Sequence, residues 1–230
     1  RDIIFVTDID SALFLVLSTF KQKLYFDVAD FLESFMSKWP KFIRYIISKL
    51  YVLVYFRASK IILPDVNRVS RVPLFFRRKI VIINNAPIIS GKYEIKRNED
   101  VSNKLRILYY GGLSYDRGLE FLVGISKTFP EVQVEVAGWG QLSDKMLSEP
   151  CINFHGMLDE GDVYRLLLNC DVSYVFYDPS YDHNKRASPN KLYEAIHFEK
   201  PLIVARGTSI DNIVAKFNIG YVFDYNYFDL

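Results

Sequence analysis

The sequence predicts an α/β protein with doubly wound parallel sheets that carry helices on both faces. Runs typical of strands alternate with helical patterns along the chain, as expected for repeated β-α-β units. Several strand runs are continuously apolar, which is the pattern of a parallel strand buried on both faces. One polar, charge-rich stretch, residues 92–104, interrupts the alternation and separates two units.

The elements follow in order from these patterns. In the first unit, short β-branched runs alternate with segments whose apolar residues recur every three or four positions. The expected strands there are 3–7, 24–28, 60–64 and 79–84, and the expected helices are 11–21 and 40–58. In the second unit, the expected strands are 106–111, 132–137, 152–156, 172–177, 201–205 and 220–223, and the expected helices are 119–129, 161–169, 190–199 and 209–217.

These elements predict a first Rossmann-like domain over residues 1–91, a linker over 92–104 and a second Rossmann-like domain over 105–230. A chain of 230 residues is long enough to bury two such cores. It starts at Arg1 without Met, enters a strand pattern at once, and stops shortly after another strand pattern. We therefore expect both ends to be cut relative to a longer protein, so that the first domain is incomplete.

Composition excludes some classes of protein. Half of the residues are apolar and 16% are aromatic, which excludes a disordered chain. The two cysteines, Cys151 and Cys170, show no metal-ligand spacing and fit reduced thiols in a cytoplasmic protein.

Positive charge is concentrated in residues 38–79, which hold eleven Lys or Arg residues against one acid, Asp65. The helical pattern in this segment places basic residues on one stripe and Ile43, Ile46 and Val54 on the opposite side. A basic, aromatic helix of this kind can lie on an anionic membrane surface, and the alternative is a core helix with a solvated cationic edge. No recognition helix or aromatic–basic strand motif accompanies the charge, so nucleic acid is not an expected partner.

A helix start with the features of an anion site follows the strand at 172–177. Ser188 is expected as the N-cap and Pro189 as the first helical residue, where its missing N–H has no consequence. The free backbone N–H groups of Asn190, Lys191 and Leu192 then point outward at the positive end of the helix dipole. Phosphate is the usual occupant of such a site, and Lys191 adds a mobile cation.

Two neighbouring features extend this site toward a nucleotide. Glu194 lies one turn further along the helix, where a carboxylate can accept hydrogen bonds from ribose hydroxyls. After the strand at 106–111, the paired glycines Gly111 and Gly112 let the backbone approach a ligand, and Arg117 can grip phosphate oxygens. The alternative is an ordinary capped helix with a surface Glu and a purely structural glycine turn.

Two further loops follow strands of the second unit, at the edge where α/β sheets bind ligands. Gly138 and Gly140 form a tight turn, which is half of a dinucleotide fingerprint. The third glycine and the acidic residue are absent, so a nicotinamide-binding domain is not expected. In the other loop, the backbone at Gly156 and the side chain of Met157 can sandwich a base.

In their order, these loops resemble the GT-B fold glycosyltransferases, specifically the large retaining group that includes family 4. The resemblance covers residues 105–225, is fainter before them, and looks like the branch that acts on bacterial surface polysaccharides. The matching stretches are Tyr110-Gly111-Gly112-Leu113 with Arg117-Gly118, Ala137-Gly138-Trp139-Gly140, Ile152-Asn153-Phe154-His155-Gly156, Asp178-Pro179-Ser180, and Ser188-Pro189-Asn190-Lys191-Leu192-Tyr193-Glu194-Ala195 with Lys200-Pro201.

The resemblance implies an enzyme that moves a sugar from a UDP- or GDP-sugar to an acceptor hydroxyl, with retention and without a metal or other cofactor. Glu194 would hold the ribose, Arg117 and the helix start at 188–192 would hold the diphosphate, and the backbone near Gly156 and Met157 would contact the base. The implied partners are the nucleotide-sugar donor, a glycan or polyprenyl-linked acceptor and, through segment 38–79, the anionic inner face of the cell membrane. The implied location is the cytoplasm, with the enzyme peripheral on that membrane.

This sequence departs from the family pattern at several positions. The family often has Arg where Gly112 stands, and a second glutamate where Arg186 stands. These departures, with the expected loss of the first strands, leave a non-catalytic nucleotide-sugar-binding module as one alternative. Another enzyme of the same fold, a GT-B nucleotide-sugar 2-epimerase, is a second alternative. Asp8 and Asp10 form the Asp-x-Asp pattern that chelates a metal in the other glycosyltransferase fold, but beside a GT-B pattern we expect no metal site there.

Overall fold

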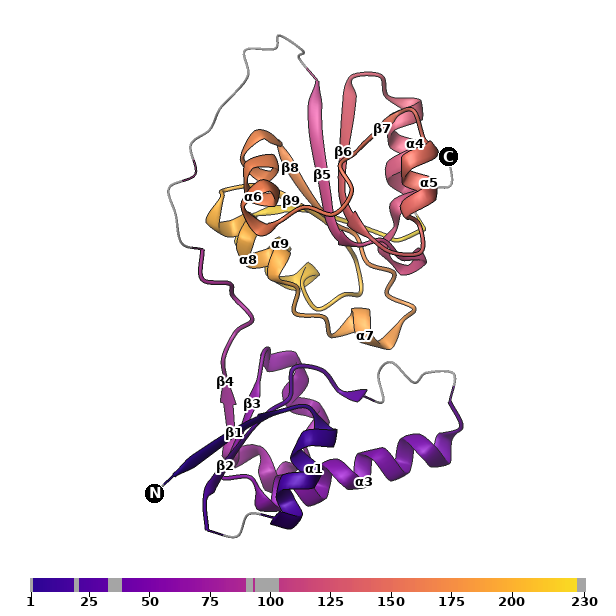
Figure 1. Cartoon of the computed structure of the whole chain (residues 1–230). Helices are drawn as coiled ribbons and strands as arrows, with labels where there is room; N and C mark the ends of the chain where they lie inside the picture. Colours follow the sequence, from indigo (N-terminus) through magenta and orange to yellow (C-terminus); the bar gives the residue numbers. More distant parts are fainter. Residues whose placement is uncertain (1, 19–20, 33–38, 90–92, 94–103, 227–230) are drawn as a thin grey trace. The chain divides into compact units, whose positions relative to one another are not determined.

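The computed structural model describes residues 2–18, 21–32, 39–89, 93 and 104–226 (Figure 1). It contains two compact units, Arg1–Asn85 and Ala86–Leu230. The predicted linker, residues 92–104, lies outside the described residues except for Tyr93 and Lys104. The ring of Tyr93 packs edge-on against Tyr164 and Phe198, with centroid distances of 5.3 Å and 5.9 Å.

The first unit contains one four-stranded parallel sheet with the order β1-β2-β3-β4. Its strands are β1 (Ile3–Thr7), β2 (Lys23–Asp27), β3 (Lys60–Leu63) and β4 (Ile80–Ile82), and its helices are α1 (Ile9–Ser18), α3 (Lys41–Arg57) and the 3₁₀ segments η1 (Val66–Arg71) and η2 (Leu74–Lys79). The two 3₁₀ segments were not predicted, because turns this short carry no 3.6-residue repeat.

Helix α3 has two apolar faces, of which only one belongs to the core. Ile47, Tyr51, Val54 and Tyr55 recur at helical spacing and are buried, and the rings of Tyr51 and Tyr55 pack against Phe26 of β2. The sequence pattern placed Ile46 on this inner side, and that was wrong, because Ile46 is exposed.

The second unit contains a six-stranded parallel sheet with the order β10-β9-β8-β5-β6-β7. The strands are β5 (Leu105–Gly112), β6 (Val132–Trp139), β7 (Ile152–Phe154), β8 (Val172–Val175), β9 (Leu202–Ala205) and β10 (Gly220–Phe223). The helices are η3 (Tyr115–Arg117), α4 (Leu119–Thr128), α5 (Ser143–Ser148), α6 (Glu160–Asn169), α7 (Asp182–Lys185), α8 (Asn190–His197) and α9 (Asp211–Phe217).

Strand β5 shows why the predicted strands are continuously apolar. Ile107 and Tyr109 pack with α4 on one face of the sheet, and Leu108 and Tyr110 pack with Leu167 of α6 on the other. Figure 1 shows helices on both sides of this sheet. Each side chain of the strand therefore meets an apolar layer, and no polar alternation arises. The predicted doubly wound α/β class is confirmed.

The strand order places a topological switch point between β5 and β8. From β5 the chain builds outward through β6 and β7, and from β8 it builds outward in the other direction through β9 and β10. The loops after β5 and β8 therefore leave on opposite sides, and a crevice between them is the usual ligand site of such a sheet.

Candidate functional site

The predicted site residues Arg117, Lys191 and Glu194 gather around the switch point, beside the carboxyl ends of β5 and β8. Arg117 comes from η3, directly after β5. Lys191 and Glu194 lie on α8, in the connection after β8, and both are buried. The sheet order brings these segments together although about 70 residues separate them along the chain.

Lys191 is buried among aromatic rings. Only 8% of the residue is exposed, and its Nζ lies 4.3 Å, 5.3 Å and 5.6 Å from the ring centroids of Tyr109, Tyr110 and Tyr177. Burial, together with the nearby charge of Arg117, lowers the pKa of the Lys191 ammonium to about 7, although the charge of Glu194 opposes this shift. An ammonium held this way is stabilised chiefly by ring faces, and an anion placed beside it would favour its charged form.

Glu194 lies on the same face of α8 and is held by a tyrosine. Its Oε2 accepts a hydrogen bond from the Tyr110 hydroxyl at 2.5 Å, and both groups are buried. Burial raises the pKa of Glu194, although the bond from Tyr110 and the charge of Lys191 favour the ionised form. Since Tyr110 contacts one carboxylate oxygen, the orientation of the other oxygen is fixed as well.

The Arg117 guanidinium is held on two sides. Its central carbon lies 4.3 Å from the centroid of the Tyr177 ring, and its Nη1 donates to Oδ1 of Asn184 at 3.1 Å. A stacked, hydrogen-bonded guanidinium has a defined plane, which suits it to bidentate binding of phosphate oxygens.

The start of α8 differs by one residue from the sequence prediction. Pro189, rather than Ser188, occupies the cap position, and no side chain caps the helix. The N–H of Leu192 is not free, because it donates to the Pro189 carbonyl at 3.1 Å. Within the described part of the chain, the N–H groups of Asn190 and Lys191 meet no acceptor. Two backbone donors instead of three are therefore left at the positive end of this helix.

The glycines predicted to bind the ligand have different surroundings. Gly111 has a φ of 110°, and a Cβ there would lie 3.1 Å from the Nζ of Lys191. A Cβ on Gly138 would lie 1.9 Å from the carbonyl oxygen of Gly111, so the close approach of β5 and β6 already explains this glycine. A Cβ on Gly112 would meet nothing within 4 Å.

The remaining predicted loop lies next to Gly138. The N–H of Gly138 donates to the carbonyl of Gly156 at 2.7 Å, so β6 and the loop after β7 are joined at this edge. Met157 follows with 77% of its surface exposed, and Gly156 has open space around its Cα.

Four residues of this site were missed by the sequence analysis: Tyr110, Asp116, Tyr177 and Asn184. Asp116 is buried, and burial alone would raise its pKa. The hydrogen bonds from His183 and Ser114, the charge of Arg117 and the bond from Asn184 outweigh this effect and hold its pKa well below the usual range. The spacing of these four residues along the chain does not show that they meet in space. The one sequence signal that could have pointed to a site residue is the pair of tyrosines directly before Gly111.

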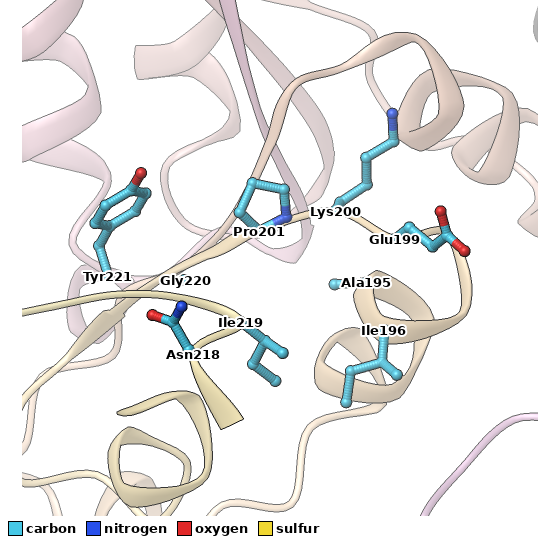
Figure 2. Close-up of a pocket in the computed structure, with 9 residues that line it drawn as sticks. All are labelled: Ala195, Ile196, Glu199, Lys200, Pro201, Asn218, Ile219, Gly220 and Tyr221. Atoms are coloured by element: carbon cyan, nitrogen blue, oxygen red, sulfur yellow. The ribbon is translucent and has the colours of Figure 1, made fainter. Parts of the chain in front are cut away.

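A cavity of about 480 Å³ lies on another part of the second unit (Figure 2). It is lined by the end of α8 and the beginnings of β9 and β10, including Ile196, Pro201 and Ile219. This is the amino edge of the sheet, opposite the edge where parallel sheets bind ligands. Its Lys200 ammonium donates to the Leu168 carbonyl at 2.8 Å. We therefore place the candidate site at the switch point and not in this cavity.

Other titratable groups form local pairs. His155 Nε2 lies 2.5 Å from Glu135 Oε2, and His183 Nε2 lies 3.0 Å from Asp116 Oδ2.

Among the residues that the structure describes, no three His, Cys, Asp or Glu side chains are grouped so that they could hold a metal ion. In the same residues, no helix is long and apolar enough to cross a bilayer.

Comparison of the sequence with family models and with curated proteins finds no match. Comparison of the structure with solved structures finds many. The chain is similar to HepE of Anabaena in complex with UDP, at 16% identity and a TM-score of 0.71, covering 98% of this chain and 65% of that one. It is also similar to sucrose-phosphate synthase of Thermosynechococcus elongatus, at 13% identity and a TM-score of 0.72, covering 98% and 61%.

A third similar structure is the catalytic domain of starch synthase IV of Arabidopsis thaliana bound to ADP and acarbose. It has 11% identity, a TM-score of 0.60 and coverage of 97% of this chain and 62% of that one. These structures are GT-B glycosyltransferases, and the predicted GT-B fold is confirmed. The chain spans less than two thirds of the length of each of these three solved chains.

Proposed function

We propose that this chain is part of a glycosyltransferase that binds a UDP- or GDP-sugar at the switch point of its second unit and transfers the sugar to an acceptor hydroxyl. The observation that carries the proposal is the gathering of Arg117, Lys191 and Glu194, with the unpaired N–H groups of α8, at one end of a parallel sheet. Cations and backbone donors beside a buried carboxylate suit a diphosphate next to a ribose.

The diphosphate would lie against Arg117, Lys191 and the start of α8. In the reaction, the bond between the anomeric carbon and the diphosphate oxygen breaks, and the acceptor oxygen forms the new bond to that carbon on the same face of the sugar. The acceptor proton passes to the departing diphosphate. Charge develops on the diphosphate oxygens in the transition state, and donors already in place there lower the barrier.

Arg117 and Lys191 supply this stabilisation from the protein itself, so we infer transfer without a metal ion. The ribose would hydrogen-bond to the carboxylate of Glu194. The base would lie near Gly156 and Met157, where backbone groups and a flexible apolar side chain are exposed at the same edge of the sheet. The glycines Gly111, Gly112 and Gly138 would let the backbone approach the donor.

The first unit would carry the acceptor, a glycan or a polyprenyl-linked sugar used in bacterial cell-surface polysaccharide synthesis. The HepE structure with UDP and glucose and the TarM structure with UDP and alpha-GlcNAc-glycerol are solved neighbours of this chain that combine a uridine nucleotide with a sugar. We infer a cytoplasmic enzyme, as the resemblance to this group of glycosyltransferases implies.

Binding to the inner face of the membrane would occur through the basic segment 38–79. On α3, Phe42, Ile46, Lys49, Leu53 and Phe56 recur every three or four residues on its solvent-exposed face. Phe56 continues this face to Phe75 of η2, at a ring distance of 6.3 Å, and Arg78 lies over Phe75. Exposed aromatic side chains among cations suit the headgroup region of an anionic bilayer.

Calorimetric titration of UDP, GDP and ADP into the purified chain tests the donor site, with Arg117→Ala and Glu194→Ala alongside. We expect one nucleotide to bind and each substitution to weaken it by about 100-fold for Arg117 and about tenfold for Glu194, from the loss of charged and neutral hydrogen bonds. Arg165→Ala is the matched control, because the side chain of Arg165 is exposed and pairs with its neighbour Asp162 on α6.

If the folded wild-type chain binds none of the three nucleotides, the donor site is wrong. If it binds one but the full-length parent transfers no sugar, the alternative of a non-catalytic nucleotide-sugar-binding module takes its place. An epimerised sugar among the products would instead indicate the 2-epimerase.

A further inference from the structure

Within the connection between β8 and α8, residues 178–188 are anchored in part by the side chain of Asn184. Asn184 of α7 is completely buried, with 0% of its surface exposed. Its Nδ2 donates to Oδ2 of Asp116 and to the carbonyl of Asp178, each at 3.0 Å. A backbone bond from the N–H of Asp178 to the carbonyl of Asp116, at 2.9 Å, joins the same two loops.

The other end of the Asn184 amide contacts Arg117. Oδ1 of Asn184 accepts from Nη1 of Arg117 at 3.1 Å, while the ring of Tyr177 lies against the guanidinium and Asp116 Oδ2 lies 3.7 Å from its Nε. Asn184 therefore uses both halves of its amide. The nitrogen fixes the side chain to the protein, and the oxygen fixes the guanidinium to the side chain.

We propose that Asn184 is a positioning residue for anion binding, which holds the Arg117 guanidinium so that its remaining N–H donors face the switch point. The identity of the anion as a nucleoside diphosphate rests on the proposed function. A free arginine side chain has many rotamers and loses that freedom when it binds, whereas a guanidinium already held in one plane loses less. Asn184 would therefore raise the affinity for the diphosphate without touching it.

The geometry separates this role from that of a purely structural asparagine. A structural role depends on the Nδ2 bonds to Asp116 and Asp178, which hold the two loops together. The positioning role depends on the Oδ1 bond to Arg117. Asn184→Ala removes both sets of bonds, so a double-mutant cycle with Arg117→Ala isolates the part of its effect that passes through Arg117.

The first readout is a double-mutant cycle measured by calorimetric titration of UDP into wild type, Asn184→Ala, Arg117→Ala and the double variant. We expect Asn184→Ala to weaken UDP binding about tenfold, as for residues within one hydrogen-bond network, and to have no further effect once Arg117 is alanine. Lys185→Ala, a half-exposed neighbour on α7 that pairs with Asp182, is the matched control and should bind like wild type.

Additive losses in the cycle, with all four proteins folded by circular dichroism, would overturn the proposal. GDP or ADP replaces UDP in the same cycle if the wild type prefers one of them.

The second readout does not depend on any nucleotide. Phenylglyoxal modifies guanidinium groups, and peptide mass spectrometry follows each arginine separately. The side chain of Arg117 is 25% exposed, whereas those of Arg165 and Arg206 are 67% and 64% exposed and serve as references within the same molecule. We expect Asn184→Ala to speed modification of Arg117 severalfold while the two reference rates stay constant, and Lys185→Ala to change none of them.

An unchanged rate at Arg117 in folded Asn184→Ala would show that Asn184 does not hold the guanidinium. If the wild type binds no nucleotide but the modification rate responds as expected, the proposed donor fails and the positioning of Arg117 stands for another anion. If Asn184→Ala does not fold, Asn184→Ser, which keeps a small polar group but cannot reach Arg117, replaces it in both readouts with the same expected results. Wild-type protection and affinity in a folded Asn184→Ser variant would overturn the proposal.

Discussion

Helices α8 and α3 invert the usual distribution of residues in opposite ways. Helix α8 buries charge, since Lys191 and Glu194 are only 8% exposed each. Helix α3 exposes apolar surface, since Phe42 and Phe56 are both 64% exposed. In most soluble domains charged side chains stay outside and contiguous apolar faces stay inside. The buried charges suit a small polar ligand, and the exposed apolar face suits an extended surface.

The difference also shows in what surrounds each group. Around Lys191, aromatic rings and the close backbone of Gly111 leave little room, which limits what can bind. Around Phe56, the neighbours Phe75 and Arg78 are themselves at the surface, which allows a broad contact. If α8 binds a small polar ligand and α3 binds an extended surface, substitutions on α8 should change the affinity for a nucleotide. Substitutions on the exposed face of α3 should change only binding to a lipid surface.

The largest expected effect is that of Lys191→Met, which keeps the length of the side chain and removes its charge. Loss of a buried cation from the diphosphate site should weaken nucleotide binding by about 100-fold or more.

The same variant should be more stable, because the pKa of the folded-state ammonium is lowered to about 7 from the ordinary 10.5. The folded state then binds fewer protons than the unfolded state between these values, so burial of Lys191 destabilises the protein most below pH 7 and progressively less up to pH 10.5.

Thermal unfolding of both proteins at pH 6 and pH 9 measures this effect, and each kcal/mol gained should raise the midpoint by about 2–4 °C. The gain should be larger at pH 6. The groups that face the ammonium, and that must remain unchanged in the variant, are Tyr109, Tyr110, Tyr177, Arg117 and Glu194. A variant that is less stable than wild type at pH 6 would contradict a strained buried charge on α8.

A smaller effect is expected for Tyr110→Phe, which removes the hydroxyl that orients Glu194. Binding of UDP should fall by about five- to tenfold, as for one buried hydrogen bond. Binding of 2′-deoxy-UDP should change less, because it lacks a hydroxyl that the carboxylate would hold. Calorimetric titration of both nucleotides measures the difference, with the exposed Tyr221→Phe as control. Equal losses for the two nucleotides would remove Glu194 from ribose binding.

On α3, replacing both Phe42 and Phe56 by serine should lower sedimentation with anionic liposomes by about tenfold, from the loss of two buried aromatic contacts in the interface. Nucleotide binding should not change. Binding of the wild type should also weaken as salt is raised, since exposed cations contribute. The control is serine at Phe129, an exposed phenylalanine of the second unit. Failure of the wild type to sediment would end the membrane proposal and leave α3 as an exposed face without this role.

The smallest expected effect is that of a chelator. If Arg117, Lys191 and the α8 donors stabilise the leaving diphosphate, sugar transfer by the full-length parent should be unchanged by EDTA and by added manganese. Loss of turnover with EDTA that manganese restores would show that these groups are not sufficient.

Several features were predictable from the sequence because they depend on neighbouring residues. The alternation of strands and helices follows from local apolar periodicity, and the glycine loops follow strands because tight turns need glycine. The free N–H groups of Asn190 and Lys191 at the start of α8 were also predictable, although the exact cap was not. Pro189 rather than Ser188 occupies the cap position, and its carbonyl accepts a hydrogen bond from the N–H of Leu192. Local sequence does not resolve a helix start to within one residue.

Other features depend on residues far apart in the chain. Tyr110 and Glu194 are 84 residues apart, and Arg117 and Asn184 are 67 apart, yet each pair shares a hydrogen bond. The exposure of Ile46 on α3 was likewise not visible, because both faces of that helix are apolar and only the position of the sheet selects the buried one.

The sequence by itself therefore determined the fold class, the order of the strands and the three charged residues that gather at the candidate site. Apolar periodicity, glycine turns and proline near the start of a helix act over a few residues, and local physical chemistry is sufficient for them. The tertiary structure alone decided that Tyr110 holds Glu194, that Asn184 holds Arg117 and that three tyrosine rings surround Lys191. Those contacts depend on the strand order at the switch point between β5 and β8, which is set by packing of the whole sheet.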